Sequence, residues 1–151
     1  MSRPAAAGAF VLDASVTASW LLPDERTAAA ESAYLRLRSR QLDAHAPELW
    51  LWECGNVIAN GVKRQRIAPA DAPSVWGLLD AIRMRVALST FEPAQVCECL
   101  ALAVDESLSI YDAAYLWLAR TMSLPLLSHD ERLCAAAARK QIRTLRMEQV
   151  A

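Results

Sequence analysis

The sequence has few of the residues that the commonest nucleotide-binding and metal sites require. It contains only 4 glycines, and no G-x-G-x-x-G or Walker pattern occurs, which argues against the usual phosphate-binding loops. The 2 histidines are too few for a histidine-based metal site, and the 4 cysteines form no C-x-x-C pair. We therefore expect free, buried thiols rather than a zinc site.

Excess charge and long apolar runs are absent as well. The chain has 16 basic and 17 acidic side chains, for a formal net charge of −1, so no overall charge attracts it to a polyanion. Any nucleic-acid site must come from local clusters of arginine and lysine. The apolar run from Ala5 to Leu12 ends at Asp13, and no run approaches the length of a membrane span. We expect a soluble, cytoplasmic protein without an export signal or a membrane partner.

The length and the apolar content favour one folded domain over residues 1–151. A chain of 151 residues lies in the usual size range of a single domain. Its hydrophobic fraction of 54% excludes a disordered protein. A domain of this size buries enough surface to fold without disulfides or a structural metal.

Short apolar segments alternate with helical patterns along the chain. The apolar segments predict strands at 9–13, 44–46, 86–89, 124–127 and 142–145. Periodicity and helix-starting residues predict helices at 15–22, 24–40, 48–63, 70–85, 93–107, 111–122 and 131–140, with Pro47 opening the third. This alternation indicates an α/β fold with a parallel sheet and helices on its faces.

Three aspartates fall where a parallel α/β fold places its ligand site. Asp13 ends the first strand, Asp112 begins a helix, and Asp130 follows the fourth strand. In open parallel sheets, ligands bind beyond the carboxyl ends of the strands. The alternative is that each aspartate caps the helix that follows it, and Ser128 with Glu131 has the spacing of a capping box.

Glu53 is harder to explain as an ordinary surface residue. Its neighbours in the predicted helix are apolar, namely Leu49, Trp50, Leu51, Trp52, Val57 and Ile58. A lone carboxylate in such a setting costs free energy unless it is paired or bound to a cation. Glu53, Asn56 and Asn60 form one helical stripe with Leu49. A polar stripe on so apolar a helix indicates a site, and the alternative is a stripe that faces solvent.

Four carboxylates that converge would repel one another. Their natural counterion is a hard divalent cation with oxygen ligands, Mg²⁺ or Mn²⁺. Such ions bridge phosphate oxygens and lower the pKa of a bound water. Carboxylates, a hard metal and phosphate together indicate phosphodiester hydrolysis.

Four segments resemble, in order and spacing, the successive motifs of the PIN-domain family and in particular of its VapC-like toxins. They are V-L-D-A-S-V at 11–16, E-L-W-L-W-E-C-G-N at 48–56, L-S-I-Y-D-A-A-Y-L-W-L-A at 108–119 and L-P-L-L-S-H-D-E-R-L at 124–133. The resemblance covers nearly the whole chain. It implies a PIN-like three-layer α/β/α sandwich with a short central parallel sheet. Ser123 and Gln141 depart from the family pattern, because glycine is frequent at both positions.

The resemblance also implies roles for individual residues. The catalytic and metal-binding acids would be Asp13, Glu53, Asp112 and Asp130, and the supporting residues Ser15, Asn56 and Ser128. The implied activity is that of a Mg²⁺- or Mn²⁺-dependent endoribonuclease, the toxin of a toxin–antitoxin pair. Such proteins are often homodimers and are often inhibited by a cognate antitoxin protein.

Basic and aromatic residues provide candidate binding surfaces. Lys63, Arg64 and Arg66 follow the Glu53 helix and are the candidates for contacts with RNA phosphates. Their alternative role is to complement the helix dipole on a solvated surface. Most tryptophans should lie in the core. The alternative, for Trp20 and for Trp50 or Trp52, is a groove that takes a second copy or the antitoxin.

Two other functions compete with the ribonuclease. The first is a non-catalytic PIN-like module that binds RNA or protein, which the presence of all four acids disfavours. The second is an enzyme that forms an aspartyl phosphate on Asp13. That chemistry would require an acid or amide two residues after Asp13, where this chain has Ser15.

Overall fold

Five short parallel strands form the centre of the fold in the computed structural model, which describes residues 8–151. They are β1 (Ala9–Leu12), β2 (Asp43–Pro47), β3 (Val86–Ser89), β4 (Leu126–Leu127) and β5 (Thr144–Leu145). Their order in the sheet is β3-β2-β1-β4-β5, and Val11 of the central strand pairs with His45 and Leu126. The residues before Gly8, on which the expectation of no export signal partly rests, lie outside the described range.

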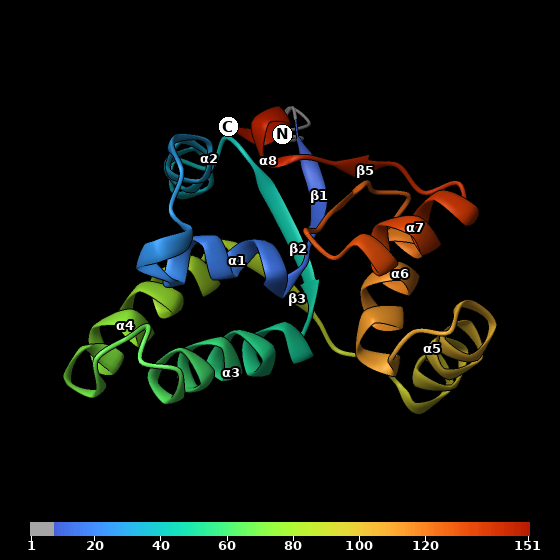
Figure 1. The fold of residues 1–151 in the computed structure, drawn as a ribbon. Coiled ribbons are helices and arrows are strands. Elements are labelled where there is room, and N and C mark those ends of the chain that lie inside the picture. The colour runs from blue at the N-terminus through green and yellow to red at the C-terminus, as the bar shows by residue number, and fades with distance from the viewer. Residues whose placement is uncertain (1–7) are drawn as a thin grey trace.

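Eight α-helices and two 3₁₀ turns are present in residues 8–151. They are α1 (Ala14–Leu21), η1 (Pro23–Glu25), α2 (Ala28–Arg38), α3 (Leu49–Lys63), η2 (Pro69–Asp71), α4 (Ala72–Arg83), α5 (Pro93–Glu106), α6 (Ile110–Met122), α7 (Glu131–Arg139) and α8 (Met147–Val150). Figure 1 shows α1 to α4 on one side of the sheet and α5 to α7 on the other. The predicted three-layer α/β/α sandwich is confirmed.

Several predicted element boundaries were wrong, and proline explains two of them. The second helix begins at Ala28 instead of Asp24, because Pro23 starts a separate 3₁₀ turn and the hydroxyl of Thr27 caps the helix. Pro47 does not open α3 but ends β2, since the next N–H, that of Glu48, still bonds the Ser89 carbonyl of β3. The short helix α8 was not predicted.

The core explains why two of the tryptophans do not form a docking groove. Trp50 is fully buried, and its indole N–H donates to the Thr17 hydroxyl at 3.1 Å. Trp20 is 5% exposed and donates to the Ala30 carbonyl at 2.8 Å. Each indole thus finds its polar partner inside the fold, as buried tryptophans require. Of the three tryptophans considered for a docking groove, Trp52, which is 83% exposed, can still contact a partner.

The two positions at which the family often has glycine adopt the backbone conformation that favours it. Ser123 ends α6 with φ 55°, and Gln141 follows α7 with φ 59°. Both lie in the left-handed region, which costs a residue with a side chain more than it costs glycine. The departures therefore affect the turns that follow the helices and not the acidic residues.

The cysteines are free, as predicted, but not all of them are buried. Cys54 and Cys99 are buried, Cys134 is partly exposed and Cys97 is exposed. The exposure of Cys97 follows from its place on the outer face of α5, two residues from Cys99.

Within residues 8–151, no helix is both long enough and apolar enough to cross a membrane.

Candidate active site

Asp13 lies at the carboxyl end of β1 and is buried against two hydroxyl groups. Its Oδ2 accepts hydrogen bonds from Ser15 Oγ at 2.5 Å and Ser128 Oγ at 2.6 Å. Asp13 precedes α1, but its side chain makes no capping hydrogen bond to that helix. The alternative that Asp13 is an ordinary helix cap is therefore wrong.

The two serines connect the loop after β4 to the turn after β1. Ser128 Oγ accepts the backbone N–H of Asp130, and Ser15 Oγ accepts that of His129, both at 3.0 Å. The alternative of a capping box of Ser128 with Glu131 does not form, because Asp130 and not Ser128 is the N-cap residue of α7. Asp130 itself caps α7, with Oδ1 accepting the N–H of Leu133 at 3.0 Å.

Asp112 lies in the first turn of α6, but another residue caps that helix. The hydroxyl of Ser109 accepts the Asp112 N–H at 3.0 Å. The carboxylate of Asp112 is thus not used as a cap and faces the same hollow as Asp13. Of the three aspartates, only Asp130 combines a place in this hollow with a capping hydrogen bond.

Glu53 reaches the hollow from α3, on the opposite side from α6. Glu53, Asn56 and Asn60 of the predicted stripe all line the hollow, together with Val57, but Asn56 and Asn60 are exposed and Glu53 is partly buried. The hydroxyl of Tyr115 on α6 donates to Glu53 Oε1 at 2.7 Å. The stripe therefore does not simply face open solvent.

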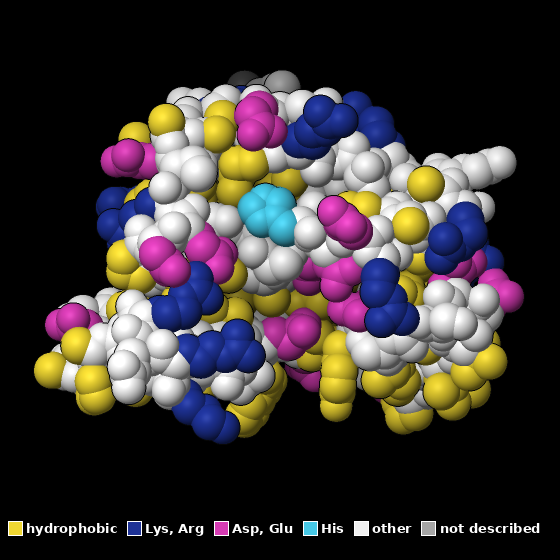
Figure 2. Space-filling view, in the orientation of Figure 1, with side chains coloured by type: hydrophobic (Ala, Val, Ile, Leu, Met, Phe, Trp, Pro, Cys, Tyr) yellow, Lys and Arg dark blue, Asp and Glu magenta, His cyan; other side chains and the backbone are white. Residues whose placement is uncertain are grey.

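These elements enclose a hollow of about 260 Å³ that holds all four acids. Its lining residues are Asp13, Ala14, Ser15, Glu53, Asn56, Val57, Asn60, Asp112 and Asp130. Figure 2 shows acidic side chains gathered in the centre of the molecule, with basic side chains on both flanks. A second pocket of about 290 Å³, between α1, α2 and α4, has only Glu31 as an acid. The first hollow is therefore the better candidate for chemistry.

Burial and mutual repulsion raise the pKa of three of the carboxyl groups. For Asp13 the main cause is burial, with the charge of Asp130 adding to it and the two serine hydroxyls opposing it. Burial also raises the pKa of Glu53 to about 7, with help from Asp13 and Asp112 and against the Tyr115 hydrogen bond. Asp112 has a raised pKa for the same reasons. The hollow thus makes the charged forms of these three carboxyl groups costly.

The donor set fits a hydrated hard cation. Carboxylate, amide and hydroxyl oxygens are the ligands that Mg²⁺ and Mn²⁺ prefer. As the side chains stand, no three His, Cys, Asp or Glu residues among residues 8–151 form a ready-made ligand set. Mg²⁺ usually keeps several waters and binds through one or two carboxylates. Waters would therefore complete its contacts with the remaining acids.

The basic residues near the site are not equivalent. Lys63 and Arg64 are exposed at the end of α3. Arg66 instead bonds Asp24 and Glu25, at 2.9 and 2.6 Å, so its guanidinium group is engaged by two acids. No sequence pattern singled out Arg132. This exposed residue of α7 lowers the pKa of Asp112 and donates to the Ser107 carbonyl at 2.8 Å.

Comparisons with known proteins identify the family and the fold. A family model of the PIN domain matches residues 10–139. Ribonuclease VapC3 from Pyrobaculum aerophilum is 28% identical over 128 residues, which cover 82% of this chain and 91% of that protein. The crystal structure of PAE2754 from Pyrobaculum aerophilum matches with a TM-score of 0.71, covering 97% of this chain and 95% of that one. The sequence identity to that protein is 22%, so this similarity supports the fold alone.

Proposed function

This chain belongs to the PIN-domain family, and we propose that it is a Mg²⁺- or Mn²⁺-dependent endoribonuclease that acts as the toxin of a toxin–antitoxin pair. The observation that carries the proposal is the convergence of Asp13, Glu53, Asp112 and Asp130 on one hollow. A relative named as a ribonuclease, aligned over most of both chains, supports RNA as the substrate.

We assign the four acids the role of holding the cation, directly or through water. A bound Mg²⁺ or Mn²⁺ supplies a more acidic water and a charge that stabilises phosphate oxygens. Ser15 and Ser128 hold the Asp13 carboxylate in place through their hydroxyls. Asn56 offers an amide to the same hollow.

The charge pattern around the hollow suits RNA only when the acids are neutralised. Uncompensated carboxylates repel phosphates, so cation binding would also permit the substrate to approach. The exposed Lys63 and Arg64 on one flank are the candidates for contacts with the RNA backbone. Arg66 is a weaker candidate, because such a contact would have to compete with Asp24 and Glu25.

We expect the purified protein to cleave structured RNA in the presence of Mg²⁺ or Mn²⁺. Cleavage should stop when EDTA removes the metal. Gel analysis of the products checks this, and Asp13→Asn protein prepared in the same way controls for a contaminating nuclease. Cleavage that persists in EDTA would contradict the metal dependence. RNA binding without cleavage under every metal condition would favour the non-catalytic module instead.

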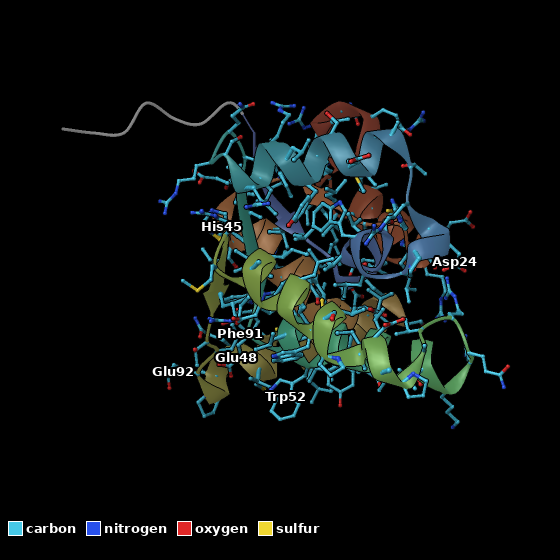
Figure 3. The ribbon with its side chains drawn as sticks, turned by 90° about the vertical axis from the view of Figure 1, so that its left-hand side faces the viewer. Asp24, His45, Glu48, Trp52, Phe91 and Glu92 are labelled. Carbon is cyan, nitrogen blue, oxygen red and sulfur yellow. The ribbon has the colours of Figure 1, made fainter. Side chains whose placement is uncertain are left out.

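We also propose that the protein forms a homodimer that a cognate antitoxin protein inhibits. An exposed apolar face supports the dimer. On α5, Val96, Leu100 and Val104 are spaced by four residues and are 41%, 52% and 75% exposed, and on α3 Trp52 is 83% exposed. Figure 3 shows Trp52 at the edge of the molecule, pointing away from its body, and Figure 2 shows apolar side chains along the lower edge over α5. Contiguous exposed apolar surface commonly marks a protein interface.

Trp52→Ala should convert the dimer to a monomer, because a central exposed tryptophan usually contributes strongly to an interface. Light scattering at tens of micromolar protein measures the mass. Leu35→Ala is the matched control, since Leu35 is 56% exposed on α2, a helix that contributes no residue to the proposed interface. A wild-type monomer at these concentrations would count against the dimer.

A further inference from the structure

Helix α6 directs a second polar side chain toward the candidate active site besides that of Asp112. Tyr115 lies three residues further along α6, so the two residues share a helix face. Asp112 is partly exposed in the hollow, whereas Tyr115 is fully buried behind it. Tyr115 is therefore not placed to contact a substrate and must act, if at all, through a neighbour.

That neighbour is Glu53. The Tyr115 hydroxyl donates to Glu53 Oε1 at 2.7 Å across 62 residues of sequence. The bond connects α6 to α3, and both helices contribute residues to the lining of the hollow. A hydrogen bond to a carboxylate in a partly buried setting is stronger than one between neutral groups. It therefore restricts the rotation of a side chain that would otherwise be flexible.

We propose that Tyr115 is a positioning residue that holds Oε1 of Glu53 and so leaves the other carboxylate oxygen for the divalent cation. The inference rests on the proposed function, because it assumes that Glu53 takes part in metal binding. Groups that bond to metal-ligating carboxylates orient them, and their loss typically lowers metal affinity or activity by about 10–100-fold.

The competing explanation is that Tyr115 only fills the core. Its ring lies among buried residues of α6, and a phenylalanine would fill the same space. The two explanations differ in what the hydroxyl does. Removing it leaves the packing of the ring intact but takes from Glu53 the donor that orients it.

The test is Tyr115→Phe, measured first as metal binding without RNA. The Mn²⁺ concentration that gives half of the maximal rise in melting temperature should increase about 10-fold or more. At saturating Mn²⁺ the variant should regain most of the RNA cleavage rate of the wild type. Tyr34→Phe is the matched control. Tyr34 is a partly buried tyrosine of α2 that lines the pocket around Trp20 instead of the acidic hollow, and its Mn²⁺ dependence should stay unchanged.

A second substitution shows whether Tyr115 acts through Glu53. In a Glu53→Gln background, adding Tyr115→Phe should not change the half-maximal Mn²⁺ concentration further. If Tyr115→Phe does not fold, Glu53→Asp takes its place, because the shorter carboxylate withdraws from the hydroxyl and should raise the Mn²⁺ requirement similarly.

Equal Mn²⁺ dependence of wild type and Tyr115→Phe would overturn the positioning role while leaving the proposed function intact. A further loss in the Glu53→Gln background would also overturn it, since the hydroxyl would then act independently of Glu53. A wild-type protein that neither responds to metal nor cleaves RNA would refute the proposed function and this inference together.

Discussion

Asp13→Asn and Asp112→Asn should each abolish RNA cleavage while the protein stays folded. Asparagine keeps the size of aspartate and an oxygen that can accept the hydroxyls now bonded to Asp13. It lacks the negative charge that a hard cation requires. Displacement of a bound reactant by about 1 Å costs roughly 100-fold in rate, so we expect a loss of at least this size at each position.

The same substitutions should leave the metal-free protein as stable as the wild type or slightly more stable. Burial raises the pKa of Asp13, which means that its charged form is held at a cost in the folded state. A neutral amide removes that cost and the repulsion from Asp130. Circular dichroism melting in EDTA measures the stability, and cleavage of a structured RNA in Mn²⁺ measures the activity.

Asp80→Asn is the matched control for these substitutions. Asp80 is an exposed residue of α4 that pairs with Arg83 at 3.0 Å, and such surface pairs contribute little to stability. Its loss should change neither melting nor cleavage. In bacteria, induced expression of the wild type and of Asp80→Asn should slow growth, whereas Asp13→Asn should not. Folded Asp13→Asn protein that cleaves at the wild-type rate would show that the carboxylate is structural.

Metal-free stability should fall as the pH rises from about 5 to about 8, and Mn²⁺ should reverse the loss. Folding raises the pKa of Glu53 from 4.5 to about 7, so between these values the folded state binds more protons than the unfolded state. Stability from such a group is complete below the unfolded pKa and is lost as the pH rises through the folded pKa. The raised pKa values of Asp13 and Asp112 act in the same direction.

The size of this effect is limited by solvent. Glu53 is only partly buried, and after allowance for screening we expect on the order of 1 kcal/mol. That corresponds to about 2–4 °C in melting temperature for a chain of this length. The carboxylates of Asp105 and Glu106, whose pKa values salt bridges lower, act oppositely but only in more acidic solution. The window between pH 5 and 8 is therefore governed by the acidic hollow.

Mn²⁺ should raise the melting temperature more at pH 7.5 than at pH 5.5, because protons compete with the cation for the same carboxylates. A metal concentration about 100 times the dissociation constant adds roughly 2.7 kcal/mol. Calorimetry in EDTA and in Mn²⁺ at both pH values provides the measurement. In Asp13→Asn both the pH dependence and the metal response should be smaller. A melting temperature that changes neither with pH nor with Mn²⁺ would contradict the proposal that the carboxylates of the hollow repel one another and bind a cation.

The sequence was sufficient to predict the fold class and most of the candidate site residues. Alternating apolar segments and helical patterns indicated the α/β layers. A strand or helix with a buried face has apolar residues at regular intervals along the sequence. Asp13 and Asp130 were predicted from their places after parallel strands, since such strands present their carboxyl ends at one edge. Glu53 and Asn56 followed from a polar stripe on an apolar helix.

Which side chains meet depends on how the helices and strands are arranged in space. The pairing of Ser128 with Asp13 spans 115 residues and replaces a capping box that the local sequence favoured. No local sequence pattern predicted the hydrogen bond of Tyr115 to Glu53 or the ion pair of Arg66 with Asp24. Local patterns record capping and burial along one segment, whereas these contacts depend on the order of the strands. The order β3-β2-β1-β4-β5 places β1 and β4 side by side, and that adjacency brings Ser128 to Asp13.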